Sequence, residues 1–245
     1  MEKLETQRNV FAPFGELVAR SLAEELEVKG GLLQPKDLYI KQKTEDIVVA
    51  IETELARREK NLNRAAAALH EKLFLLPRIQ REKIEKEMIR AEGKVIDILD
   101  PKEEIRKEDT FQSLLGLSND TLLWIYSVGY QFFEDGKKED AFAIFQMLTT
   151  LNPLVADYWI AEGLTQKALN YDMESLHSFA MASVMKPNNP IPRCQSVEIY
   201  LKMGQIDNAK LEFAVLEKIM QSSGYPELGP FVDLLRNKIQ FSKAS

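Results

Sequence analysis

The fold is decided by residues 122–155, LLWIYSVGYQFFEDGKKEDAFAIFQMLTTLNPLV, because the pattern of this stretch returns twice further along the chain. The second copy, residues 156–189, reads ADYWIAEGLTQKALNYDMESLHSFAMASVMKPNN. A weaker third copy, residues 190–223, reads PIPRCQSVEIYLKMGQIDNAKLEFAVLEKIMQSS. Each copy has apolar residues at helical spacing, and a fixed period of this length is typical of stacked helix pairs.

Small residues recur at fixed places in the three copies. Gly129 and Gly163 occupy the same place in the first two copies and predict where the two helices of a pair cross, since a missing side chain permits a close approach. Gly136 and Gly204 are predicted at the turns between helices, and each second helix carries a phenylalanine. The remaining residues that define the pattern are Ala141, Ala209, Phe145, Phe179, Phe213, Pro153 and Pro187, and its departures are Asn170, Ser175, Val197 and Gln221.

This pattern resembles the tetratricopeptide repeat, in which each unit is a pair of antiparallel helices. The predicted fold is all-α, with three tetratricopeptide helix pairs over about 122–155, 156–189 and 190–223. After the third pair, apolar residues recur at helical spacing over 226–241, beside a polar face. Since a stack of repeats needs a terminal helix that shields its last unit, this segment is predicted to be a cap. A generic helical bundle is the alternative.

The N-terminal part of the chain, 1–110, differs in composition from the rest. It contains 44 charged residues and four aromatics, whereas residues 111–245 contain 26 charged residues and 17 aromatics. We therefore expect a domain boundary near 107–111. The predicted parts are an amphipathic helix with its connector over 1–43, a charged helical hairpin or coiled-coil-like region over 44–109, and the repeat domain over 110–245.

The charged region has two apolar series separated by Pro77. The series before it repeats every seven residues and the series after it follows a 4-3-4-3 spacing, which predicts two helices around a proline break. A hairpin folded onto its own chain is one interpretation, and a seam that pairs two chains in a homodimer is the other. The members of the two series are Val48, Leu55, Leu62, Leu69 and Leu76, then Ile84, Met88, Ala91, Val95 and Ile98.

The first helix of the first repeat is apolar on two faces. One face is expected to contact the partner helix, and the second carries Leu123, Tyr126, Tyr130 and Phe133 at 3-4-3 spacing. A helix of this kind buries both faces or keeps one for a ligand. We predict a peptide-binding groove on the concave side of the repeats, with packing of the N-terminal half or of a second copy as the alternative. In the later repeats the groove is predicted to continue through Ile160, Leu164, Lys167, Cys194 and Leu201.

From about Thr121 to Gln221 the chain resembles the class II type III secretion chaperones, the SycD/LcrH-like proteins. This resemblance implies a small acidic helical cradle in the bacterial cytoplasm. It also implies a secreted, translocator-like client, held through an extended segment in the groove. The chain departs from that family in having a long segment, 1–110, before its repeats. The residues that carry the resemblance are Tyr126, Tyr130, Phe133, Gly136, Ala141 and Phe145.

Other functions find little support in the sequence. A net charge of −6 argues against nucleic acid as the main partner, and no apolar run is long enough to span a membrane. The sequence has no nucleotide-binding, zinc-protease or hydrolase motif, so we expect no enzyme activity and no cofactor or metal. His70 is expected to be exposed, His177 to be a partly buried packing residue and Cys194 to be an ordinary half-buried thiol. An oligomeric scaffold whose repeats dock a larger assembly is the alternative function.

Overall fold

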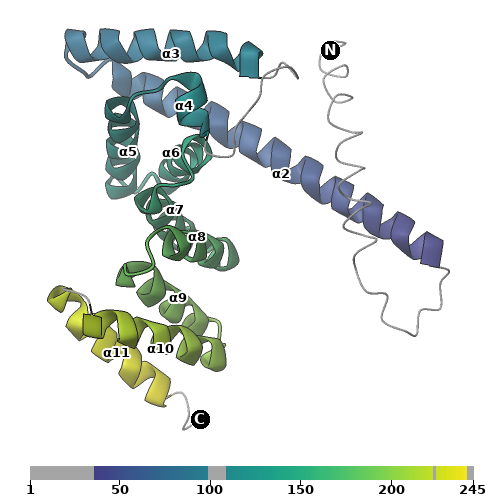
Figure 1. The fold of residues 1–245 in the computed structure, drawn as a ribbon, viewed down its shortest axis with the longest axis vertical. Helices are drawn as coiled ribbons and strands as arrows, with labels where there is room; N and C mark the ends of the chain where they lie inside the picture. Colours follow the sequence, from purple (N-terminus) through teal and green to yellow (C-terminus); the bar gives the residue numbers. More distant parts are fainter. Residues whose placement is uncertain (1–35, 99–108, 223–224, 242–245) are drawn as a thin grey trace. The chain divides into compact units, whose positions relative to one another are not determined.

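The computed structural model describes residues 36–98, 109–222 and 225–241, and no strand occurs among them. The chain is therefore all-α over these ranges, as predicted (Figure 1). Of the segment 1–43, predicted to be an amphipathic helix with its connector, residues 1–35 lie outside the described residues, and 36–43 form the start of α2. The α-helices are α2 (Lys36–Leu73), α3 (Arg78–Ile98), α4 (Phe111–Leu115), α5 (Asn119–Glu134), α6 (Lys138–Leu151), α7 (Ala156–Ala168), α8 (Asp172–Met185), α9 (Pro190–Lys202), α10 (Ile206–Ser222) and α11 (Gly229–Phe241).

The helices from α5 onward form three pairs and a cap. Helix α5 packs on α6, α7 on α8 and α9 on α10, while α6–α7 and α8–α9 contacts join successive pairs. The three pairs coincide with the three predicted repeats. A short 3₁₀ turn (Pro226–Leu228) leads into α11, whose Val232, Leu235 and Ile239 are buried against the third pair. The predicted cap is therefore present.

The predicted crossing glycines lie where the helices of a pair come closest. A Cβ placed on Gly129 would lie 2.8 Å from Cε1 of Phe145, and one placed on Gly163 would lie 2.7 Å from Cε1 of Phe179. Real Cβ atoms do not approach that closely, so only glycine fits at this helix spacing. In the third pair Val197 occupies the crossing position and is fully buried.

The three repeat turns share one backbone geometry. Gly136 has a φ of 75°, Gly204 has a φ of 72° and Asn170 has a φ of 63°. Asparagine tolerates the left-handed region better than most residues, which explains how it replaces the turn glycine. The replacement of alanine by Ser175 is also accommodated, because its buried hydroxyl donates a 2.7 Å hydrogen bond to the carbonyl of Gly163.

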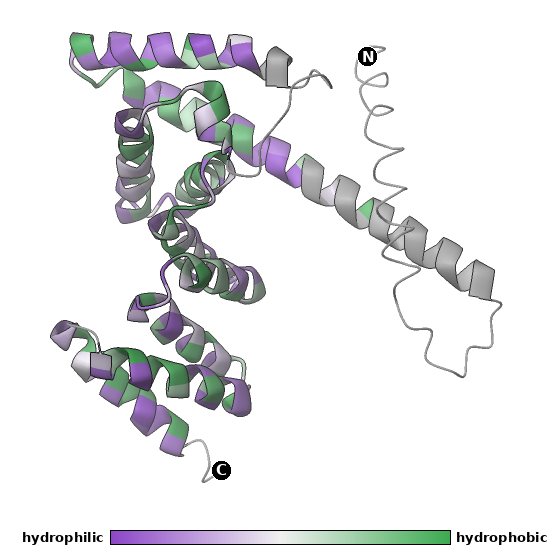
Figure 2. Cartoon of the chain, in the orientation of Figure 1, coloured by the Kyte–Doolittle hydropathy of each residue, from purple (hydrophilic) through white to green (hydrophobic). Residues whose placement is uncertain are grey.

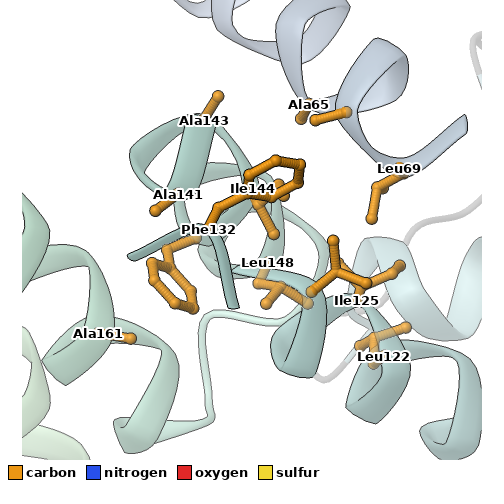
Figure 3. Close-up of a cluster of buried hydrophobic side chains, with 13 residues drawn as sticks. Ala65, Leu69, Leu122, Ile125, Phe132, Ala141, Ala143, Ile144, Leu148 and Ala161 are labelled. Atoms are coloured by element: carbon orange, nitrogen blue, oxygen red, sulfur yellow. The ribbon is translucent and has the colours of Figure 1, made fainter. Parts of the chain in front are cut away.

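By its internal contacts the chain divides into two compact units, residues 1–60 and 61–245. In the first unit the described residues, 36–60, form the first part of α2. The second unit begins well before the boundary expected near 107–111. The reason is that Ala65, Ala68 and Leu69, at the end of α2, belong to the same buried cluster as the first repeat (Figure 3).

A turn at residues 74–77, which includes Pro77, joins α2 to α3. Two polar links support the apolar contacts of α2 with the first repeat. Nδ2 of Asn61 donates to Oε1 of Gln146 at 2.7 Å, and Arg64 pairs with Asp140 at 2.5 Å. From Asn61 onward, α2 thus packs on the first repeat of its own chain. In Figure 2, α3 is coloured largely as hydrophilic, in keeping with the charged composition of this region.

Within the ranges that the structure describes, no helix has the length and apolar character needed to cross a membrane.

Candidate peptide-binding site

Two side chains of the predicted groove project from α5 into solvent. Leu123 is 66% exposed and Tyr130 is 54% exposed, although the opposite face of α5 is buried in the first repeat. The helix starts at its N-cap Ser118, whose hydroxyl accepts a hydrogen bond from the amide of Thr121. An exposed leucine and tyrosine on one helix, two turns apart, lie on the same side of it and form an apolar contact surface.

Tyr126 lies between these two residues and is half-buried. Its ring centroid is 5.6 Å from that of Phe145 and 5.8 Å from that of Tyr158, a residue of α7. Burial raises the pKa of Tyr126, and the charge of Asp157 and the neighbouring Tyr130 add to this effect. The phenol therefore stays protonated at neutral pH, so that it can both donate and accept hydrogen bonds. A neutral hydroxyl of this kind is better suited to the N–H and C=O groups of a peptide backbone than to a charged ligand.

Tyr158 is a member of this surface that the sequence interpretation missed. It is half-buried and its pKa is also raised, mainly by burial and then by Tyr126 and Asp157. The repeat pattern gave no signal for it, because Tyr158 lies one repeat period after Trp124, a residue that was not assigned to the groove. The pair of Tyr126 and Tyr158 joins the first and second repeats.

The other groove residues predicted on α5 and α7 offer less surface. Phe133 is half-buried and packs against the first core cluster, while Ile160 is buried. Leu164 is half-buried against Leu176, Phe179 and Ile199.

A polar link joins α7 to α9 at Lys167. Its ammonium group donates to Oε1 of Gln195 at 2.6 Å and forms an ion pair with Glu198. The one cation of the predicted groove is therefore neutralised by a neighbouring carboxylate. The surface around Lys167 therefore offers a ligand little uncompensated charge.

Cys194 does not line an open surface in the structure. It is 1% exposed and belongs to the buried cluster of the third repeat and α11, in which Leu235 is also fully buried. Burial raises the pKa of its thiol to about 11. Leu201 is half-buried against the same cluster. Cys194 is therefore not part of the exposed contact surface, and its thiol is fully buried rather than half-buried as expected.

Both histidines lie at the surface of the protein. His70 is exposed, as expected, and its ring contacts that of Phe74 edge-on. His177 is also exposed, rather than partly buried, and its ring centroid lies 6.2 Å from that of Trp159. Among the residues that the structure describes, no group of three His, Cys, Asp or Glu side chains is placed to hold a metal ion.

Comparison with known proteins identifies relatives of the repeat region. No family model matches the chain. The low calcium response locus protein H of Yersinia pestis is 27% identical over 136 residues, which are 55% of this chain and 80% of that protein. The chain is a homologue of low calcium response locus protein H. The resemblance to LcrH-like proteins that the repeat residues predicted is thereby confirmed.

A solved structure shares the fold of the repeat region. A type III secretion system complex from Aeromonas hydrophila contains a chain that is 24% identical, with a TM-score of 0.52. The match covers 56% of this LcrH homologue and 89% of that chain, and it shows a shared fold. PcrH, solved in complex with the chaperone-binding region of PopD, is 26% identical with a TM-score of 0.49, over 53% of this chain and 96% of its own.

Proposed function

We propose that this LcrH homologue is a non-enzymatic chaperone of a bacterial type III secretion system. It acts in the cytoplasm and holds a translocator-like secreted protein through an extended segment that lies along α5 and α7. The homology with low calcium response locus protein H supports the class of function. The observation that carries the binding site is the exposure of Leu123 and Tyr130 on either side of the half-buried Tyr126.

The chemistry of this surface favours an extended, apolar segment. Covering Leu123 and Tyr130 removes apolar area from water, which is favourable by about 25 cal/mol per Å² of apolar surface. The tyrosine hydroxyl groups can meet the free N–H and C=O groups that an extended backbone presents. The ion pair of Lys167 and Glu198 leaves little net charge for an anionic ligand to recognise. No cofactor takes part.

An oligomeric scaffold is the second candidate function. Its support comes from the turn between α2 and α3, where Phe74, Leu75 and Ile79 are exposed close together along the chain. An apolar tip of this kind is suited to docking or to self-association. The chaperone function has the stronger support, because the homology covers the repeats.

Co-purification from the native host, followed by mass spectrometry, tests the proposal. A chaperone should retain a secreted partner in stoichiometric amount. The double variant Leu123→Asp with Tyr130→Asp should lose this partner, since the two charges oppose burial of the contact surface. Leu211→Asp is the matched control, because Leu211 is equally exposed but lies on α10. Equal recovery of the partner with both variants would refute the site, and loss with the control alone would do the same.

A further inference from the structure

A buried carboxylate of α3 holds the start of α5. Glu87 is 6% exposed, and its Oε2 atom accepts three hydrogen bonds. The donors are the amide of Ser118 at 3.0 Å, the hydroxyl of Ser118 at 2.9 Å and the hydroxyl of Thr121 at 2.6 Å. Every one of these donors belongs to the first turn of α5 or to its cap.

Ser118 is itself the N-cap of α5. Its hydroxyl accepts from the amide of Thr121 at 3.3 Å and donates to Glu87, so the capping group is fixed by a residue of another helix. A negative charge is favourable at a helix N-terminus, where amide groups are left without partners inside the helix. Next to this contact, Nζ of Lys83 lies 2.7 Å from Oδ2 of Asp120, which adds a second link from α3 to the first turn of α5.

The end of α2 covers the same side of the first repeat with apolar residues. Ala65, Ala68 and Leu69 are buried together with Leu122 and Ile125 of α5 (Figure 3). A stack of helix pairs exposes the apolar side of its first unit unless another element shields it. At the opposite end of the stack, α11 has this role.

We propose that α3 and the part of α2 from Asn61 onward are the N-terminal cap of the repeat stack. Within this cap, Glu87 is a positioning residue that fixes the start of α5. Helix α5 also carries Leu123 and Tyr130, so the cap sets the orientation of the contact surface. This last consequence rests on the proposed function, whereas the positioning of α5 by Glu87 does not.

The ionisation of Glu87 gives the contact a pH dependence. Burial raises the pKa of this carboxyl, but the hydrogen bonds from Thr121 and Ser118 and the charge of Lys83 outweigh burial, and the pKa is lowered overall. Because the folded pKa lies below the unfolded value of about 4.5, the stabilisation is fully present above that pH and is lost as pH falls through the folded pKa. The other titratable groups that face this contact are Lys83 on α3, Asp120 on α5 and His70 on α2, which shares a cavity with Thr121.

Hydrogen–deuterium exchange of the full chain tests the proposal without a client. In Glu87→Gln, the amides of residues 118–126 should exchange about tenfold faster than in the unaltered protein, since a charge-assisted contact is lost at the helix start. Exchange in α10 should stay unchanged. Glu85→Gln is the matched control, because it removes the same charge from the same helix and its carboxylate is an exposed partner of Arg81.

A pH series separates positioning from general packing. Exchange of residues 118–126, corrected for its intrinsic pH dependence, should stay constant in the unaltered chain down to about pH 4.5 and accelerate as the pH falls further, whereas Glu87→Gln should lack this acceleration. His70 and Asp120 are present in both proteins, so the difference reports Glu87. If the variant does not fold, the unaltered chain alone tests the proposal. Exchange that accelerates at low pH in α5 and not in α10 would support the positioning of α5 by Glu87. Uniform acceleration in α5 and α10, or equal profiles in both proteins, would overturn the proposal while leaving the proposed function intact.

Discussion

Cε1 of Phe179 lies 2.7 Å from the point where a Cβ of Gly163 would stand. The first repeat has the same relationship between Gly129 and Phe145, at 2.8 Å. In both pairs the ring of the second helix fills the space left by the missing side chain of the first. The helix spacing of these two repeats is therefore set by a glycine and a phenylalanine together.

Gly163→Ala should destabilise the protein by about 1–3 kcal/mol, the usual cost of overpacking a core. Phe179 is fully buried and cannot move aside without disturbing its neighbours. Gly93→Ala in α3 is the control, because a Cβ there meets nothing within 4 Å and should stabilise the helix by about 0.5–1 kcal/mol. Urea unfolding followed by circular dichroism measures both changes. A stabilising effect of Gly163→Ala as well would show that the crossing is not tightly packed.

Tyr130→Ala should weaken client capture while changing the unfolding free energy by less than about 0.5 kcal/mol, since the side chain is exposed. Phe145→Ala should cost about 3–5 kcal/mol, because its ring is buried between the helices of the first repeat. Tyr126→Ala should weaken client capture and also lower the unfolding free energy to an intermediate extent, because its ring packs on Phe145. Chemical denaturation and pull-down of the co-purified partner measure the two properties. A large stability loss in Tyr130→Ala would place that side chain in the core.

Client affinity should vary weakly with ionic strength. The contact surface is apolar, and the ammonium group of Lys167 is already paired with Glu198. Salt screens interactions between exposed charges and has little effect on apolar burial. Titration calorimetry with the co-purified client at 50 mM and 300 mM salt measures this dependence. A loss of affinity by orders of magnitude would instead indicate a site that recognises its client through charged groups.

A fragment of residues 61–245 should unfold like the full chain, and one of residues 111–245 should be less stable by at least about 3 kcal/mol. The shorter fragment lacks Leu69 and Leu73, which are buried, and it uncovers the apolar side of the first repeat. Differential scanning calorimetry of the two fragments checks this expectation. Equal melting temperatures would show that the end of α2 and α3 add nothing to the repeat stack.

Cys194 should react with a thiol reagent only when the protein unfolds. Its pKa is raised to about 11 by burial, so at pH 8 about 0.1% of the thiol is the reactive thiolate, and the side chain is also inaccessible. The rate of colour release with a disulfide reagent, with and without urea, measures the effect. Prompt reaction of the native protein would mean that Cys194 opens to solvent and would return it to the contact surface.

The repeat architecture was predictable from the sequence because it depends on local chemistry. A glycine at a crossing permits close approach wherever it stands, as Gly129 and Gly163 do. A turn with positive φ accepts only a few residue types, which is why Asn170 can be read as a glycine substitute. The placement of Leu123 and Tyr130 on one side of α5, away from the partner helix, also followed from their spacing along a single helix.

The tertiary structure decided what depends on segments far apart in the chain. Cys194 stands two repeat periods after Tyr126 and was predicted on the same surface, but the packing of the third repeat and α11 buries it. The contact between Tyr126 and Tyr158 depends on how two repeats stack. The hydrogen bonds of Glu87 to the start of α5 join residues 31 and 34 positions apart. A periodic pattern specifies the side of a helix on which a residue lies, but the element that covers that side is chosen by packing across the whole unit.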